Sequence, residues 1–132
     1  MIPFVYANPV IQAVQSTGTE VLVRHADCSR TNLMGYFQLT EDIDRVVLCL
    51  DNHTNYSDLA DTIRHEAWHV VQACYGGQIL SSELIAKHAH PDDIEALKLY
   101  PENQHMTELA ARNVARYLSE EQVVTSIKKF CF

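Results

Sequence analysis

The sequence predicts a single α+β domain, because strand-like segments occupy its first half and helical segments its second half. A chain of 132 residues has the length of one typical domain, and a hydrophobic content of 47% is ordinary for a globular protein with a buried core. We expect one domain over residues 1–132, in which a small antiparallel sheet of about three strands packs against a central helix, with a helical part following it.

The first half contains one short helix and three strand candidates. Residues 9–16 begin at the second of two prolines and have the pattern of a short helix. Residues 20–26 alternate between apolar and polar side chains and are rich in β-branched residues, which is typical of a strand. Residues 35–40 and 45–50 are two further strand candidates. The short, largely polar connection EDID (41–44) between them predicts a hairpin.

The second half is predicted to be helical, after a polar loop at residues 51–58. A long helix is expected over residues 57–75, with Ser57 or Asp58 as its N-cap and Gly76 and Gly77 at its end. Further helical segments are expected at residues 81–89 and 90–101, followed by one long helix or two over residues 102–130.

The charge balance argues against two classes of partner. The formal net charge is −7, and the longest basic run is Lys128-Lys129, which is too short to bind a phosphate backbone. We therefore expect neither nucleic acid nor an anionic membrane as the main partner. No run reaches the roughly 18 apolar residues of a membrane span, and residues 1–10 lack the basic start of a signal peptide.

The four cysteines are far apart in the sequence and form no CxxC pair: Cys28, Cys49, Cys74 and Cys131. Cys49 and Cys74 lie in apolar runs, which is typical of small buried hydrophobic residues. We predict that the cysteines are reduced and that the protein is cytoplasmic. Whether they have a role beyond packing does not follow from the sequence.

A metal-binding pattern lies within the long helix, where residues 65–69 read HEAWH. Side chains four residues apart in a helix differ by about 40° around its axis, so His65 and His69 face the same way from adjacent turns. This spacing allows two imidazole nitrogens to bind one zinc ion (Zn²⁺). Glu66 lies about 100° away from His65, which suits a general base acting on water better than a metal ligand.

The apolar residues of this helix form a stripe nearly opposite the two histidines: Leu59, Ile63, Ala67, Val70, Val71 and Cys74. The histidines are therefore not expected in the main core. Asp61 precedes His65 by four residues, so it either orients that imidazole or is simply a solvated aspartate.

The same helix supplies no third ligand. The metzincin pattern HExxHxxGxxH would require Gly at position 72 and His at position 75, and the chain has Gln72 and Tyr75. An aspartate ligand from Asp92 or Asp93 is one alternative.

A glutamate on a later helix fits better. Glu108 lies in a strongly helical segment, and the small side chains of Ala111 and Ala115 on the same face would allow that helix to approach closely. Glu102 and His105 are the competing candidates. The other interpretation of Glu108 is a solvated glutamate paired with Arg112, four residues later.

The HEAWH motif followed downstream by ELAAR resembles the gluzincin clan of zinc metallopeptidases, specifically its small members. The resemblance covers about residues 35–118, including the order hairpin, polar loop, helix. It implies a zincin-like fold in which His65, His69 and Glu108 bind zinc and Glu66 is the catalytic base. It also implies that the hairpin offers an edge strand to an extended peptide. Larger gluzincins often have an acid four residues after the ligand glutamate, where this chain has Arg112.

We therefore expect a zinc-dependent hydrolase that acts on peptide bonds in a peptide or protein substrate. The residue that stabilises the oxyanion is left open among six candidates, which are Tyr75, Tyr100, Tyr117, His88, His90 and His105.

Two alternatives are left open. One is another HExxH amide hydrolase such as a peptide deformylase, whose third ligand is a cysteine upstream of the motif, here Cys28 or Cys49. That family's glutamate-glycine-cysteine motif is missing. The other is a zinc-stabilised binding module without catalysis, which would have no use for a base at Glu66.

Overall fold

The computed structural model describes residues 5–132. The expectation of no signal peptide concerns residues 1–10, of which residues 1–4 lie outside the described range. Within residues 5–132 the chain combines one three-stranded sheet with helices on both sides of a long central helix, so the α+β class is confirmed. None of the described helices is long and apolar enough to cross a membrane.

The sheet consists of β1 (Glu20–Leu22), β2 (Gly35–Leu39) and β3 (Asp44–Leu48), in the order β1-β3-β2. The predicted hairpin is confirmed, since β2 pairs antiparallel with β3. The prediction of a purely antiparallel sheet is wrong, because β1 pairs parallel with β3. Within the sheet, β2 lies on one side of β3. On the other side lies β1, which runs in the same direction as β3. As a result β2 forms an outer edge of the sheet.

The central helix α3 (Tyr56–Tyr75) starts close to where the sequence predicts it. Its N-cap is Asn55, whose side chain accepts a hydrogen bond from the backbone N–H of Asp58, rather than Ser57 or Asp58 itself. It ends at Gly76, which has a φ of 88°, a left-handed conformation that glycine adopts easily. The predicted N-terminal helix is α2 (Pro9–Ser16).

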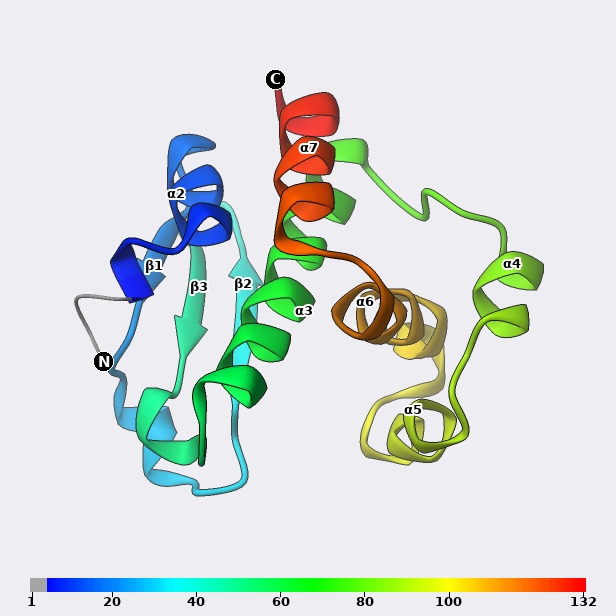
Figure 1. The fold of residues 1–132 in the computed structure, drawn as a ribbon, viewed down its shortest axis with the longest axis horizontal. Coiled ribbons are helices and arrows are strands. Elements are labelled where there is room, and N and C mark those ends of the chain that lie inside the picture. Colours follow the sequence, from blue (N-terminus) through cyan, green and yellow to red (C-terminus); the bar gives the residue numbers. More distant parts are fainter. Residues whose placement is uncertain (1–4) are drawn as a thin grey trace.

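Four helices follow: α4 (Ser82–Lys87), α5 (Pro91–Ala96), α6 (His105–Tyr117) and α7 (Glu120–Cys131). The last expected segment is therefore two helices, and the break comes at Ser119, which caps α7. Figure 1 shows α7 alongside α3, on the same side as α2. On the other side of α3 lies α6, and α4 and α5 pack against α6.

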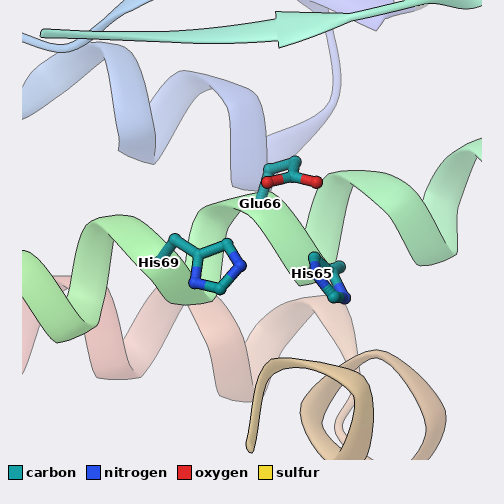
Figure 2. A group of neighbouring side chains, drawn as sticks. All are labelled: His65, Glu66 and His69. Carbon is teal, nitrogen blue, oxygen red and sulfur yellow. The ribbon is translucent and has the colours of Figure 1, made fainter. Parts of the chain in front are cut away.

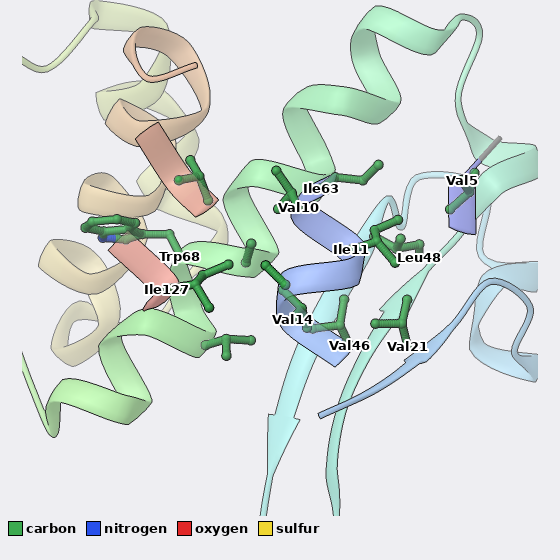
Figure 3. Close-up of a cluster of buried hydrophobic side chains, with 14 of the residues drawn as sticks. Val5, Val10, Ile11, Val14, Val21, Val46, Leu48, Ile63, Trp68 and Ile127 are labelled. Atoms are coloured by element: carbon green, nitrogen blue, oxygen red, sulfur yellow. The ribbon is translucent and has the colours of Figure 1, made fainter. Parts of the chain in front are cut away.

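The main core lies between the sheet and the helices α2, α3 and α7 (Figure 3). The predicted stripe of α3 points into it, and five of its six members are buried: Leu59, Ile63, Ala67, Val70 and Val71. A smaller cluster lies around α4 and α6. It consists of Ile85, Leu97, Leu109 and Ala110.

The prediction that the cysteines are reduced is wrong, because the structure joins them in two disulfides. Cys28 bonds to Cys49, just after β3, and Cys74 bonds to Cys131. Cys74 is exposed rather than part of the core, and its bond joins the last turn of α3 to the end of α7. Since disulfides persist mainly in oxidising environments, the cysteines no longer support a cytoplasmic location.

Candidate metal centre

The two motif histidines lie on the side of α3 that faces α6 (Figure 2). Their side chains are largely shielded from solvent, with exposed fractions of 14% for His65 and 11% for His69. Their ring centroids are 5.0 Å apart. The helical spacing therefore places two imidazoles side by side, away from the apolar stripe.

Glu108 meets both imidazoles from the first turn of α6. Its Oε2 atom lies 3.0 Å from His65 Nε2, and its Oε1 atom lies 3.1 Å from His69 Nε2. The alternative pairing of Glu108 with Arg112 is not present, since Arg112 faces Asp93 instead. Among the candidates for a third ligand, Glu108 is the one in contact with both histidines.

Small side chains and backbone contacts bring α6 close to α3. Ala111 is fully buried between the helices, as the sequence predicts. Arg64 donates a hydrogen bond to the carbonyl oxygen of Ala115 at 2.7 Å, and Gln72 Nε2 donates one to the carbonyl oxygen of Thr107 at 3.1 Å. These contacts tie both ends of α6 to α3 and so hold Glu108 in place.

Gln72 also orients one of the histidines. Its Oε1 atom accepts a hydrogen bond from His69 Nδ1 at 2.8 Å, which leaves His69 Nε2 directed at Glu108. Support of this kind, from a second hydrogen bond on the far ring nitrogen, is typical of metal-binding histidines. The sequence contained a signal for it, since Gln72 lies one helical turn after His69 on the same face.

Asp61, the residue considered for orienting His65, does not contact it. The Asp61 carboxylate instead accepts a short hydrogen bond from Arg64. The two residues are three positions apart on α3, so this local ion pair replaces the expected contact with the imidazole.

The contact between Glu108 and His69 shifts the pKa of both groups. Burial raises the pKa of Glu108, but hydrogen bonds from His65 and His69 outweigh it and lower the pKa to about 2. Burial lowers the pKa of His69, but the hydrogen bond to Glu108 and the charge of Glu66 outweigh it and raise the pKa to about 9. Two imidazole nitrogens and a carboxylate oxygen are a donor set that fits a zinc ion with an open fourth position.

Glu66 lies beside this donor set and is buried, with 6% of its surface exposed. One ligand atom from each of His65, Glu66 and His69 lies within 4.8 Å of the others. Burial raises the pKa of Glu66, although the charges of the two histidines oppose the shift. A carboxylate with a raised pKa next to a metal-type donor set suits a group that accepts and returns a proton.

Gly35, at the start of β2, allows the strand to run close to this glutamate. A Cβ atom at this position would lie 2.7 Å from the carbonyl oxygen of Val47 and 3.6 Å from Glu66 Cγ. The absence of a side chain therefore brings the edge-strand backbone against the catalytic candidate, a role of Gly35 that was not recognised in the sequence.

Two hollows open beside the histidines. The first, of about 640 Å³, is lined by the edge strand through Gly35, Tyr36 and Phe37, and by His65, Glu66, His69 and Glu108. The second has a volume of about 570 Å³ and shares four lining residues with the first, namely Gly35, His65, Glu66 and Tyr100. The two hollows thus meet at Glu66 and His65.

Of the six oxyanion candidates, Tyr100 is the one that lines these hollows. His105 donates a hydrogen bond to the carbonyl oxygen of Tyr100 at 3.0 Å, which helps to fix the backbone of Tyr100. Tyr75 packs on Phe130, away from the centre. The remaining three candidates are also elsewhere: Tyr117 and His88 line an apolar cavity among α3, α4 and α6, and His90 caps α5.

The competing acidic candidates form no hydrogen bond or ion pair with His65 or His69. Asp93 accepts two hydrogen bonds from Arg116, and Asp92 and Glu102 are exposed. Cys28 and Cys49 bond to each other, so neither is a free thiolate ligand.

The comparisons with known proteins give a family but no activity. The chain matches no curated protein and no solved structure. Residues 5–132 match the model of a family described as a domain of unknown function, DUF8637. Because this match spans nearly the whole chain, the protein belongs to the DUF8637 family.

Proposed function

We propose that this protein is a zinc-dependent metallopeptidase related to the gluzincin clan. The observation that supports this proposal best is the convergence of His65 Nε2 and His69 Nε2 on the carboxylate of Glu108, which comes from a separate helix. These three residues would hold the metal, with Gln72 orienting His69. A bound zinc ion would lower the pKa of a coordinated water to about 7 and polarise the substrate carbonyl.

Glu66 supplies the proton transfers of the reaction. Its carboxylate takes a proton from the attacking water and then delivers that proton to the nitrogen of the leaving amine. Its burial favours this cycle, because burial raises the pKa of the carboxyl group. Tyr100 lines both hollows, and its hydroxyl would donate a hydrogen bond to the oxyanion.

The edge strand β2 would bind the substrate. One side of β2 pairs with β3, and the other is the outer edge of the described sheet. A peptide in extended conformation can add to this edge by backbone hydrogen bonds, which recognises a peptide without regard to its sequence. Gly35 brings that edge against Glu66, so the scissile bond would lie next to the base.

The two alternative functions are less well supported. A deformylase-type site needs an upstream cysteine thiolate, and Cys28 and Cys49 are joined in a disulfide. A purely structural zinc site would close its fourth position and would have no use for a buried glutamate beside the donor set. Both Glu66 and the adjacent hollows favour catalysis.

We also propose that the protein works in an oxidising compartment, because both pairs of cysteines form disulfides. Intact-mass measurement of protein isolated with free thiols blocked should show no blocked cysteine. Four blocked cysteines in the native protein would contradict this location.

The test of the function is cleavage of a peptide library by zinc-loaded protein, with Glu66→Gln as the key variant. We expect wild type to cleave, and Glu66→Gln to bind zinc normally but lose cleavage by roughly 100-fold or more, the scale of a general base. Glu83→Gln, at an exposed position on α4, is the matched control and should cleave normally. Cleavage by Glu66→Gln at the wild-type rate would overturn the mechanism.

A further inference from the structure

Arg112 is a cationic side chain in the wall of the cleft that none of the roles above uses. It lies on α6 one turn after Glu108, and its side chain is 28% exposed. It lines the second hollow together with His65, Glu66 and Tyr100. A guanidinium group therefore faces the same space as the proposed base.

The nearest acid does not satisfy this guanidinium. Asp93 is held by Arg116, whose Nε and Nη2 atoms bond its two oxygens at 2.9 and 3.0 Å. Arg112 Nη1 lies 3.8 Å from Asp93 Oδ1, which is longer than a hydrogen bond. Asp93, Arg112 and Arg116 together carry a net charge of +1, because one carboxylate faces two guanidinium groups.

The Arg112 guanidinium also has an unused donor. Its Nε atom is buried and has no hydrogen-bond partner within residues 5–132. A buried donor without a partner is unfavourable, so its retention calls for an explanation. Two other acids line the second hollow: Asp61 is paired with Arg64, and Glu66 is the proposed base. In the second hollow, the Arg112 guanidinium therefore lies near Glu66 without a hydrogen-bonded acid.

We propose that Arg112 anchors a carboxylate group of the substrate in the second hollow, close to the scissile bond. The planar fork of arginine binds a carboxylate through two parallel hydrogen bonds, which gives both affinity and orientation. The carboxylate would belong to an acidic side chain or to the free C-terminus of the peptide. This inference rests on the proposed peptidase function, and it makes the protein selective for acidic or C-terminal segments.

Binding of three zinc-anchored probes tests this role without relying on turnover. The probes are tripeptides with an N-terminal hydroxamate that differ at the far end: a free C-terminal carboxylate, a C-terminal amide, and an amide with an aspartate side chain. We expect zinc-loaded wild type to bind at least one carboxylate probe about tenfold to a hundredfold more tightly than the neutral amide, as for a charged hydrogen bond. The probe that gains identifies the source of the carboxylate.

Two variants and one control separate the anchor from a merely structural role. Arg112→Gln should remove the preference while its affinity for the neutral probe stays unchanged. Arg112→Lys keeps the charge without the planar fork and should retain part of the preference for the carboxylate probe. It also provides a test if Arg112→Gln folds poorly. Arg24→Gln removes one exposed charge that lines neither hollow and should keep the full preference.

The outcomes distinguish the two proposals. Equal binding of acid and amide probes to wild type, or an unchanged preference in folded Arg112→Gln, overturns the anchor. Carboxylate preference without cleavage of any library peptide supports the anchor and overturns the peptidase. Failure of every probe to bind zinc-loaded protein overturns both proposals.

Discussion

The two faces of α3 are built on different principles. The face toward the sheet, α2 and α7 carries apolar side chains that pack into the main core. The face toward α6 carries His65 and His69, which make a few directed polar contacts with Glu108 and Gln72. One face should therefore determine stability and the other metal affinity, so substitutions on the two faces should change different measurements.

The largest effect on stability is expected from Leu59→Ala on the sheet-facing side. Leu59 is fully buried, and removing such a side chain leaves a cavity that costs about 2–5 kcal/mol in the free energy of unfolding. Urea unfolding of the metal-free protein measures this loss. Leu99→Ala, at a position that is 81% exposed, is the matched control and should change stability by less than about 0.5 kcal/mol. Similar stabilities for the two variants would disprove the separation of the faces.

The next effect is expected from the disulfide that ties the ends of α3 and α7. Cys74 and Cys131 are 57 residues apart in sequence, so their bond restricts the unfolded chain. The double variant Cys74→Ala with Cys131→Ala should lose about 2–4 kcal/mol of unfolding free energy. Its zinc affinity should remain that of wild type at temperatures where it is folded. An unchanged urea midpoint would show that this bond does not form in solution.

On the face toward α6, Gln72→Leu should weaken the metal site with a smaller change in free energy. The substitution removes the hydrogen bond to His69 Nδ1 while keeping a similar volume, and loss of such an orienting contact typically costs about 10–100-fold in metal affinity. Competition with a zinc chelator measures the change. A zinc affinity equal to that of wild type would show that Gln72 does not orient the ligand.

Asp61→Ala is the matched control for Gln72→Leu and has the smallest expected effect. The Asp61 side chain is 55% exposed where it pairs with Arg64, and ion pairs near the surface contribute about 0–1 kcal/mol to stability. Its removal should leave zinc affinity unchanged. A drop as large as that of Gln72→Leu would mean that Asp61 supports His65 in solution after all.

The same contrast explains what the sequence could predict. Periodicity revealed the core stripe of α3, and the HExxH spacing placed His65 and His69 on a shared face, because both depend only on helical geometry. The hairpin was also predictable, since alternating segments with a short polar connection are local features. The parallel pairing of β1 with β3 depends on contacts distant in sequence and was missed.

Tertiary contacts decided the remaining features. Glu108 was one of several acidic candidates, and what distinguishes it is the crossing of α6 over α3, which Ala111 and the Arg64 contact to Ala115 permit. The disulfides were missed because Cys74 has the helical position of a core residue, and its pairing with Cys131 follows only from the packing of α7. The roles of Gln72 and Gly35 likewise require the neighbouring elements to be in place.

The account depends most directly on Glu108 as a metal ligand, and equilibrium zinc titration of Glu108→Ala tests it. We predict that this variant binds zinc roughly 100-fold or more weakly than wild type, since even orienting contacts cost about 10–100-fold. Glu102→Ala, an exposed glutamate in the segment before α6, should bind zinc as wild type does. Wild-type zinc affinity in a folded Glu108→Ala variant would contradict the proposed centre.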